Sequence, residues 1–570
     1  MLTTPWGERL DESRILTEYP RPQMRRDSYL NLNGRWEYAI TGSDESPQSW
    51  DGTILVPFSP ESALSGVGRT LEPGQTLWYR RELTVPEGFL PRDGRLLLHF
   101  GAVDQEAAVY LNGVLLGRHM GGYNAFTLDA TDALGPRNTL VVRVHDDTDA
   151  SFHSRGKQKT RRGGIWYTPQ SGIWQTVWME AVPRHYIESL RIVPLFDQSA
   201  VEVTVRCAQP LQCEATVDGR TVPFTSGEAA RIPMPDFRAW SPEDPYLYDL
   251  SVTLGEDRVE SYFGMRKIEV RADRGGVKRL FLNGEPYFQS GLLDQGYWPD
   301  GLYTAPSDEA LIYDIQTAKA MGFNMLRKHI KVEPLRWYYH CDRYGMLVWQ
   351  DMPCGGGRYN PLIVSLPLIT NIHLPDSLHG LFGRGDSQGR AQFKSELGAM
   401  VNHLINCPCI AMWVIFNEGW GQFDAAKMHD YVRSIDPSRT IDHASGWHDQ
   451  GVGKVVSRHV YFRQYYFKAD KKGRAVLLSE FGGYNHHVSG HCFNNKNFGY
   501  KSFESPAQLE IAIEELYQKQ IGPAKMEGLA AAVYTQLSDV EDELNGVLTY
   551  DRKVEKISPE LMRKAIYVGD

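Results

Sequence analysis

Short runs of alternating hydrophobic and polar residues fill the first third of the chain, and Gly, Pro and Asp separate them. Runs of this length and alternation predict β-strands with one buried face. Asn112-Gly113 lies between two such runs and predicts a two-residue hairpin turn. The runs cover 77–83, 95–100, 107–111, 140–144 and 173–180. Their spacing favours a sandwich or jelly-roll domain over residues 1–183.

A second β-rich segment extends from 184 to 272. Residues 201–205, 248–254 and 259–270 alternate in the same way, and the segment has almost no helical periodicity. This length and pattern favour a small immunoglobulin-like β-sandwich. A turn-rich stretch at 271–276 marks its end.

The pattern changes from residue 273 to residue 570, where amphipathic helical stretches alternate with short apolar runs. This alternation predicts parallel strands joined by helices, and eight such units predict a C-terminal (β/α)8 TIM barrel. The apolar runs are 287–292, 324–329, 346–350, 411–417, 440–445, 455–461, 475–481 and 530–536. Two connections, 352–390 and 482–505, are unusually long, and we expect the first to fold over the barrel mouth or to pack against a second subunit.

Composition excludes several classes of partner. The 570 residues include 61 basic and 70 acidic side chains, and a net charge of -9 gives no general attraction for nucleic acid or an anionic membrane. No apolar run has the length of a membrane span, and residues 1–26 lack the apolar core of a secretory signal, which predicts a cytoplasmic protein. The seven cysteines do not form paired CxxC units, so we expect reduced thiols, no metal and no cofactor.

Two glutamates end apolar runs of the predicted barrel. Glu418 follows the run 411–417, and Glu480 closes the run that begins at Ala475. The carboxyl ends of barrel strands carry the active site in such enzymes. Double displacement at the anomeric carbon of a sugar requires one carboxylic acid to protonate the leaving oxygen and one carboxylate nucleophile. These residues predict a retaining glycoside hydrolase with a carbohydrate substrate.

The chain resembles glycoside hydrolase family 2, which includes β-galactosidases, β-glucuronidases and β-mannosidases. The resemblance rests on the domain order, on Phe416-Asn417-Glu418 and on Ser479-Glu480-Phe481-Gly482, with further matches at 32–36, 110–113 and 171–174. It implies that Glu418 is the general acid/base, that Glu480 is the nucleophile and that Asn417 binds the sugar 2-hydroxyl.

The resemblance also implies further substrate-binding residues at the barrel mouth. Arg327 and His329 match the end of the second strand, and Tyr461 matches a tyrosine that hydrogen-bonds the nucleophile, with Tyr465 and Tyr466 as alternatives. Other candidates lie on the same predicted face: Asp351, Trp447, His448 and Gln536.

Two departures from the family pattern bear on the substrate. Trp166 stands where galactosidases and glucuronidases often carry a sugar-binding aspartate, and Gln536 replaces a stacking tryptophan. The acidic run 539–543 after it is expected to be solvated or to face the sugar. Asn494-Asn495-Lys496 matches a uronate-binding pattern but is displaced along the barrel, so Lys496 is expected in a solvated loop.

These observations favour an exo-β-glycosidase of the β-galactosidase type. The alternative is a β-glucuronidase or other β-uronidase, for which Lys328 and Lys496 are the discriminating cations. A non-catalytic carbohydrate-binding protein is an alternative of another class, and the presence of both glutamates argues against it. The sequence leaves open whether the chain forms a homo-oligomer.

Overall fold

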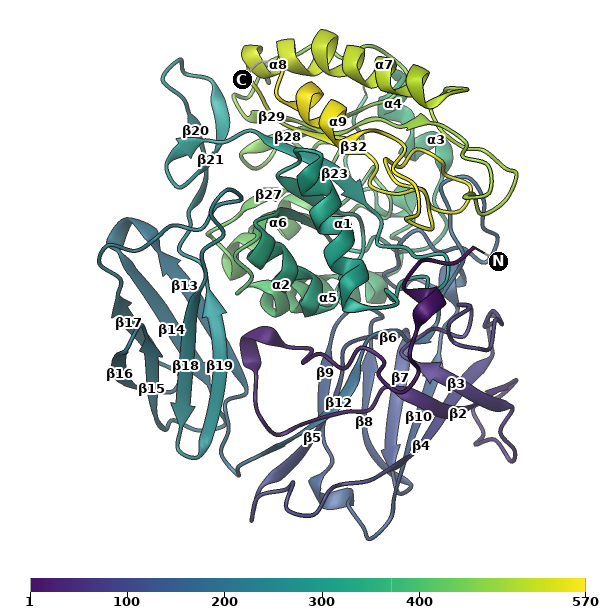
Figure 1. Cartoon of the computed structure of the whole chain (residues 1–570), viewed down its shortest axis with the longest axis vertical. Coiled ribbons are helices and arrows are strands. Elements are labelled where there is room, and N and C mark those ends of the chain that lie inside the picture. The colour runs from purple at the N-terminus through teal and green to yellow at the C-terminus, as the bar shows by residue number, and fades with distance from the viewer. Residues whose placement is uncertain (1, 371, 569–570) are drawn as a thin grey trace.

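The computed structural model describes residues 2–370 and 372–568. Two antiparallel β-sandwiches, purple to teal in Figure 1, lie beside a barrel that runs from teal through green to yellow. We propose to divide the chain into domains after residues 183 and 272. The first division falls between two sheets, whereas the second falls inside a small three-stranded sheet of residues 268–286 that lies between the second sandwich and the barrel in sequence. No helix among the described residues is long and apolar enough to cross a lipid bilayer.

The first sandwich packs a four-stranded sheet against a six-stranded sheet around a core that includes Trp36, Leu98 and Val142. The sheets have the orders β1 (Tyr29–Asn31), β12 (Val177–Val182), β5 (Arg95–Phe100), β9 (Phe126–Asp129) and β3 (Gly52–Val56), β2 (Gly34–Thr41), β4 (Thr76–Leu83), β10 (Asn138–His145), β7 (Glu106–Leu111), β8 (Val114–Met120). The predicted turn is confirmed, since Asn112 (φ 54°) and Gly113 (φ 80°) join β7 to β8.

The predicted strand 173–180 is interrupted. Gly172–Ile173 forms the short strand β11, which pairs with β6 (Val103–Asp104), and the main strand starts again at Val177. Trp174 at the break leaves the sandwich and packs into the hydrophobic core of the barrel, where its indole nitrogen donates to the Gly122 carbonyl at 2.8 Å.

The second sandwich consists of a three-stranded and a four-stranded sheet. Their orders are β13 (Ser189–Leu195), β14 (Ala200–Arg206), β17 (Ala229–Pro233) and β16 (Arg220–Thr225), β15 (Gln212–Val217), β18 (Tyr248–Leu254), β19 (Asp257–Phe263). The expected single run 259–270 is wrong, because the chain leaves this sheet after Phe263. β20 (Ile268–Ala272) instead pairs with β21 (Lys278–Leu282), which is followed by β22 (Glu285–Pro286).

The predicted TIM barrel is confirmed. Eight parallel strands form one sheet in the order β27 (Thr440–Asp442), β26 (Ile410–Val414), β25 (Leu347–Asp351), β24 (Met325–Lys328), β23 (Gln289–Asp294), β32 (Leu529–Thr535), β29 (Ala475–Gly482), β28 (Val455–Val460). Side chains link the two ends of this order, since Ser457 Oγ donates to Asp442 Oδ2 at 2.6 Å.

Helices connect the barrel strands, with Ser307 capping the first of them by accepting from the amide of Ala310. The longer ones are α1 (Asp308–Ala320), α2 (Leu335–Tyr344), α5 (Ser387–Leu404), α6 (Ala425–Ile435), α7 (Pro506–Leu516), α8 (Gly522–Glu527) and α9 (Pro559–Ile566), with a π-helix η7 (Tyr517–Ile521) between α7 and α8. A small pair, β30 (Tyr484–Asn485) and β31 (Lys501–Ser502), lies in the connection after β29. Short 3-10 helices are η1 (Gly7–Arg9), η2 (Pro22–Met24), η3 (Thr131–Ala133), η4 (Thr148–Ala150) and η5 (Phe196–Gln198).

The long connection 352–390 folds over the carboxyl ends of the strands. It carries α3 (Pro361–Val364), α4 (Leu366–Thr370) and η6 (His379–Phe382), and several of its residues line a cavity together with Glu418. His448 fastens it to the barrel, because Nε2 donates to the Ile363 carbonyl at 2.9 Å and Nδ1 accepts from the Leu374 amide at 3.1 Å.

Candidate active site

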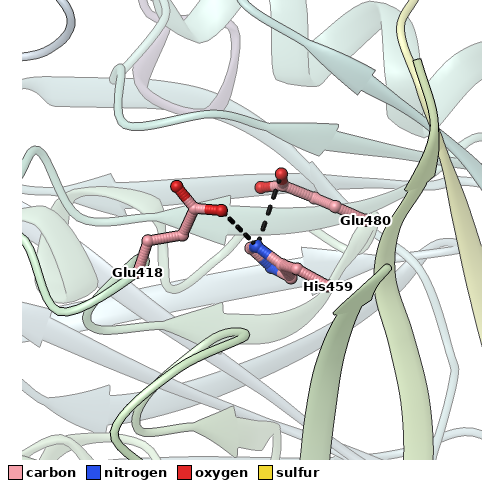
Figure 2. A group of neighbouring side chains, drawn as sticks. All are labelled: Glu418, His459 and Glu480. Atoms are coloured by element: carbon pink, nitrogen blue, oxygen red, sulfur yellow. Dashed lines mark hydrogen bonds and ion pairs between the residues drawn. The ribbon is translucent and has the colours of Figure 1, made fainter. Parts of the chain in front are cut away.

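Glu418 and Glu480 meet at the mouth of the barrel, and His459 of β28 lies between them (Figure 2). Its Nδ1 lies 2.8 Å from Glu418 Oε1 and 3.4 Å from Glu480 Oε2. One donor atom from each of the three side chains lies within 4.8 Å of the other two. Among the described residues, these three side chains form the one group of potential metal ligands that lie close enough together to hold an ion.

Hydrogen bonds from His459 continue away from the carboxylates. Ser479 Oγ donates to the Arg458 carbonyl, and Ser445 Oγ donates to Ser479 Oγ at 3.0 Å. Ser445 Oγ therefore accepts from His459 Nε2, which lies 3.1 Å away. Both ring nitrogens therefore have a partner, and the interaction with His459 lowers the pKa of both glutamates.

The surroundings shift the pKa values of the two carboxyl groups in opposite directions. Burial raises the pKa of Glu418, and the charge of Glu480 adds to this effect, although the hydrogen bond from His459 opposes it. Burial would also raise the pKa of Glu480, but the charges of His459 and Arg327 and the hydrogen bond from Tyr461 hold it below its ordinary value. A protonated acid beside an ionised carboxylate is the arrangement that acid-assisted displacement requires.

Arg327 of β24 organises the floor of the site. Its guanidinium donates two hydrogen bonds to Asp351, at 3.0 and 2.9 Å, and one to Glu480 Oε1 at 3.0 Å. A further hydrogen bond of 2.9 Å reaches Asn417 Oδ1. The Asn417 amide is therefore oriented, and its buried Nδ2 has no hydrogen-bond partner among residues 2–370 and 372–568.

Tyr461 and His329 complete the surroundings of Glu480. The Tyr461 hydroxyl donates to Glu480 Oε2, and burial raises the pKa of Tyr461 well above its usual value, so the phenol keeps its proton. His329 Nδ1 lies 2.9 Å from Gln295 Oε1, whereas Nε2 lies 3.8 Å from Glu480 Oε1 and has no hydrogen-bond partner in the described part of the chain. Burial, together with the charge of Lys157, holds the pKa of His329 well below its usual value.

A cavity of about 910 Å³ opens outward from Glu418. Its wall combines side chains of the first sandwich, among them Trp166, with Tyr359 of the 352–390 segment and with Trp420 and Trp447 of the barrel. The ring of Trp166 lies 5.1 Å from that of Trp420 and 6.3 Å from that of Tyr359, centroid to centroid. Aromatic walls with a few polar groups are typical of ligand sites.

Two family models match this architecture. The model for the TIM barrel domain of glycosyl hydrolases family 2 matches residues 304–487, and a second model for glycosyl hydrolases family 2 matches residues 185–266. The chain belongs to glycoside hydrolase family 2.

Relatives of this family 2 chain carry two kinds of name. A putative β-glucuronidase of Formosa agariphila is 25% identical over 82% of this chain, and a β-galactosidase of Thermoanaerobacter pseudethanolicus is 24% identical over 64% of it. The matches cover 56% and 47% of those proteins, so this chain spans about half the length of each. A β-D-glucuronidase structure from Dictyoglomus thermophilum has a TM-score of 0.74 at 17% identity, covering 96% of this chain and 98% of that one, which shows the same fold.

Some of the expected site residues of this family 2 chain do not reach the cavity. Both carboxylate oxygens of Asp351 accept hydrogen bonds from Arg327, and burial raises the pKa of Asp351 to about 6. Both amide ends of Gln536 are taken, by Gln295 at 2.8 Å and by Asn545 at 2.7 Å. His448 uses both ring nitrogens on backbone atoms of the 352–390 segment. These three side chains hold their neighbours rather than line the cavity.

The two lysines expected to discriminate a uronide, Lys328 and Lys496, do not line the cavity either. Lys328 is buried between Asp294 and Glu333, at 2.6 and 2.8 Å, and Lys496 is exposed. The acidic run is not solvated, because Asp539, Glu541, Asp542 and Glu543 are each at most 2% exposed.

His459, Lys157 and Trp420 were not among the expected site residues. His459 had a usable signal, because alternate residues of a strand share a face, and it lies two positions before Tyr461. Trp420 lies two positions after Glu418. Lys157 precedes the barrel by more than a hundred residues, and its sequence neighbours do not point to a site.

Proposed function

We propose that this chain is a retaining exo-β-glycosidase in which Glu418 is the acid/base and Glu480 is the nucleophile. The supporting observation is the pair of carboxylates, with an oxygen of each within 4.8 Å of the other and with pKa values pushed apart. Retaining enzymes separate their carboxyl groups by about 5–5.5 Å, whereas inverting enzymes need about 6.5–9.5 Å to admit a water molecule.

In the first step, a Glu480 oxygen attacks the anomeric carbon while Glu418 gives its proton to the glycosidic oxygen, and the alcohol leaves. In the second step, Glu418 takes a proton from water, the water oxygen attacks the anomeric carbon, and the bond to Glu480 breaks. Arg327 and Tyr461 hold Glu480 ionised and oriented through the hydrogen bonds described above. Nδ2 of Asn417, which has no partner among the described residues, donates to a hydroxyl of the sugar.

For the sugar itself, we propose a β-uronide in place of the β-galactoside favoured by the sequence. The names of the Formosa and Dictyoglomus relatives support this choice. Lys157 is buried, and its charge lowers the pKa of both catalytic glutamates. Its Nζ lies 3.6 Å from Glu543 Oε2 and 3.4 Å from the Tyr167 hydroxyl, so its protons are only loosely engaged and a substrate carboxylate can accept them.

Product stereochemistry tests the mechanism. Proton NMR of a nitrophenyl β-glycoside digest should first show the β-anomer of the free sugar. Glu418→Ala should slow substrates with poor leaving groups by on the order of 10²–10⁴-fold and activated aryl glycosides much less, and azide should rescue it as a β-glycosyl azide. First formation of the α-anomer would exclude double displacement, and rescue of Glu480→Ala with a retained product would exchange the roles.

A panel of nitrophenyl glucuronide, galacturonide and galactoside tests the sugar. Lys157→Met should lower kcat/KM for the preferred uronide by about 10²-fold, because a charge-assisted hydrogen bond is worth roughly 1.5–3 kcal/mol. The matched control is the exposed lysine in Lys496→Met, which should leave the rates unchanged. Preference for the galactoside, unaffected by Lys157→Met, would contradict the uronide assignment, and hydrolysis of none of them would favour the carbohydrate-binding alternative.

A further inference from the structure

Four cationic side chains gather on the wall of the cavity that opens from Glu418. They are Arg155, Lys159, Arg161 and Arg358. Three of them come from the first sandwich and one from the 352–390 segment, so the fold brings them together from distant parts of the sequence. The family resemblance and the proposed mechanism assign none of these four residues a role.

This positive charge is poorly balanced. Arg161 and Arg358 are exposed, and neither side chain has a hydrogen-bond or ion-pair partner among residues 2–370 and 372–568. Asp149 lines the same wall, but its Oδ1 already accepts from the amide and the hydroxyl of Thr160, at 2.9 and 2.8 Å. Burial lowers the pKa of Lys159, and Asp149 opposes this shift.

The cations adjoin an aromatic surface. Lys159 Nζ lies 3.7 Å from the ring centroid of Trp166, and the Arg155 guanidinium lies 5.5 Å from that of Tyr359. Arg155 is fixed in place by a hydrogen bond of 2.6 Å to the Gly356 carbonyl. A flat apolar face edged by cations suits a ring that carries a negative charge, because the ring packs on the aromatic surface while the charge meets the cations.

The position of the wall relative to Glu418 identifies the part of the substrate that it meets. Glu418 lines the cavity, whereas Glu480 does not. In the proposed reaction Glu418 protonates the leaving oxygen and Glu480 attacks the sugar from the other side. The space outside Glu418 is therefore where the leaving group lies.

We propose that this wall is a leaving-group subsite that takes a saccharide bearing a carboxylate or a sulfate. The inference rests on the proposed function and extends it to the second sugar of the substrate. The chain would then remove terminal sugars from acidic oligosaccharides, with Arg161 and Arg358 meeting the anion and Trp166 packing against the ring.

Coumarin glycosides of the sugar preferred in the nitrophenyl panel provide matched probes. The 4-methylumbelliferyl glycoside has a neutral leaving group, the 3-carboxyumbelliferyl glycoside carries a carboxylate, and the 7-hydroxycoumarin-4-methanesulfonate glycoside carries a sulfonate in place of sulfate. The ratio of kcat/KM for each anionic probe to that for the neutral probe is the measurement. Comparison between variants removes the effect of leaving-group acidity on this ratio.

The double variant Arg161→Ala/Arg358→Ala should lower the ratio about five- to tenfold, since each partly exposed charge pair contributes modestly. The control Arg206→Ala/Arg231→Ala removes two exposed arginines of the second sandwich and should leave the ratio unchanged. Raising the salt concentration should lower the ratio for the wild-type protein but not for Arg161→Ala/Arg358→Ala. The anionic probe whose kcat/KM ratio falls more in Arg161→Ala/Arg358→Ala identifies the anion that the wall prefers.

An unchanged ratio in Arg161→Ala/Arg358→Ala, with normal hydrolysis of the neutral probe, overturns this inference and leaves the proposed function standing. Hydrolysis of none of the three probes overturns the proposed function, and this inference with it.

Discussion

His459 is the side chain on which the different states of the two glutamates depend. Two buried carboxylates at this separation repel each other, and the imidazole between them lies within 3.4 Å of both, whereas the Arg327 guanidinium pairs with Glu480 at 3.0 Å. The effect of His459 is unequal, because it is the largest influence that lowers the pKa of Glu480, whereas burial outweighs its hydrogen bond to Glu418.

Replacing His459 by Gln should move both limbs of the pH profile of kcat/KM to higher pH. Glu480 must be ionised, and without the nearby charge its pKa rises, so the acidic limb shifts upward. Glu418 must be protonated, and without the hydrogen bond its pKa also rises, so the alkaline limb shifts in the same direction. Values of kcat/KM measured from about pH 4 to 9 give the two apparent pKa values of the coupled pair of glutamates.

Ser445→Ala is the control for this experiment. It removes the hydrogen-bond partner of His459 Nε2 but keeps the imidazole, so both limbs should move less than in His459→Gln. An unchanged profile in His459→Gln would show that another group separates the two carboxyl groups.

Tyr461→Phe should lower kcat by about 10²-fold and shift the acidic limb upward, because Glu480 loses the phenol that stabilises its ionised form. Tyr466 is 72% exposed and donates to Gln464, so Tyr466→Phe should stay within about twofold of the wild type. A large loss in Tyr466→Phe together with a normal Tyr461→Phe would exchange the roles of the two tyrosines.

At the scale of elements, the barrel strands were predictable because buried parallel strands read as continuous apolar runs. All eight were placed to within two or three residues. The two strands predicted wrongly in the sandwiches, 173–180 and 259–270, share a cause. Each contains a break in the strand that is not marked by a Gly-Pro or Asn-Gly pair in the sequence. At Gly264, a Cβ would lie 3.0 Å from Trp240 and 3.1 Å from Pro408, a close approach that only the folded structure reveals.

The 352–390 segment depends on His448 for its attachment to the barrel. His448→Ala should increase hydrogen exchange at residues 361–374, because two backbone groups of the segment lose their partner. The value of KM should rise several-fold, since Tyr359 and Leu368 of the segment line the cavity. The control His185→Ala removes an exposed histidine of the second sandwich, and unchanged exchange in His448→Ala would mean that other contacts hold the segment.

At the scale of the whole molecule, the cavity belongs to two parts of the chain that lie far apart in sequence. Arg162 donates to Asp542 at 3.0 Å, and Tyr167 donates to Glu543, although about 380 residues separate each pair. Contacts of this kind leave no local pattern, which is why the acidic run was expected to be solvated. Without its distant partners such a run would be exposed, and the sequence alone does not show those partners.

The pairing of Arg162 with Asp542 should set the position of Trp166 and therefore the affinity for substrate. Arg162→Ala and Asp542→Ala should each raise KM about five- to tenfold with little change in kcat, because Glu418 and Glu480 keep their own contacts. The double variant should be no worse than Arg162→Ala alone, since both changes break one link, and a double-mutant cycle on kcat/KM measures this coupling. Arg162 also donates to Glu541 at 3.1 Å, so its replacement should have the larger effect. Fully additive losses would mean that the first sandwich is held over the barrel without this pair.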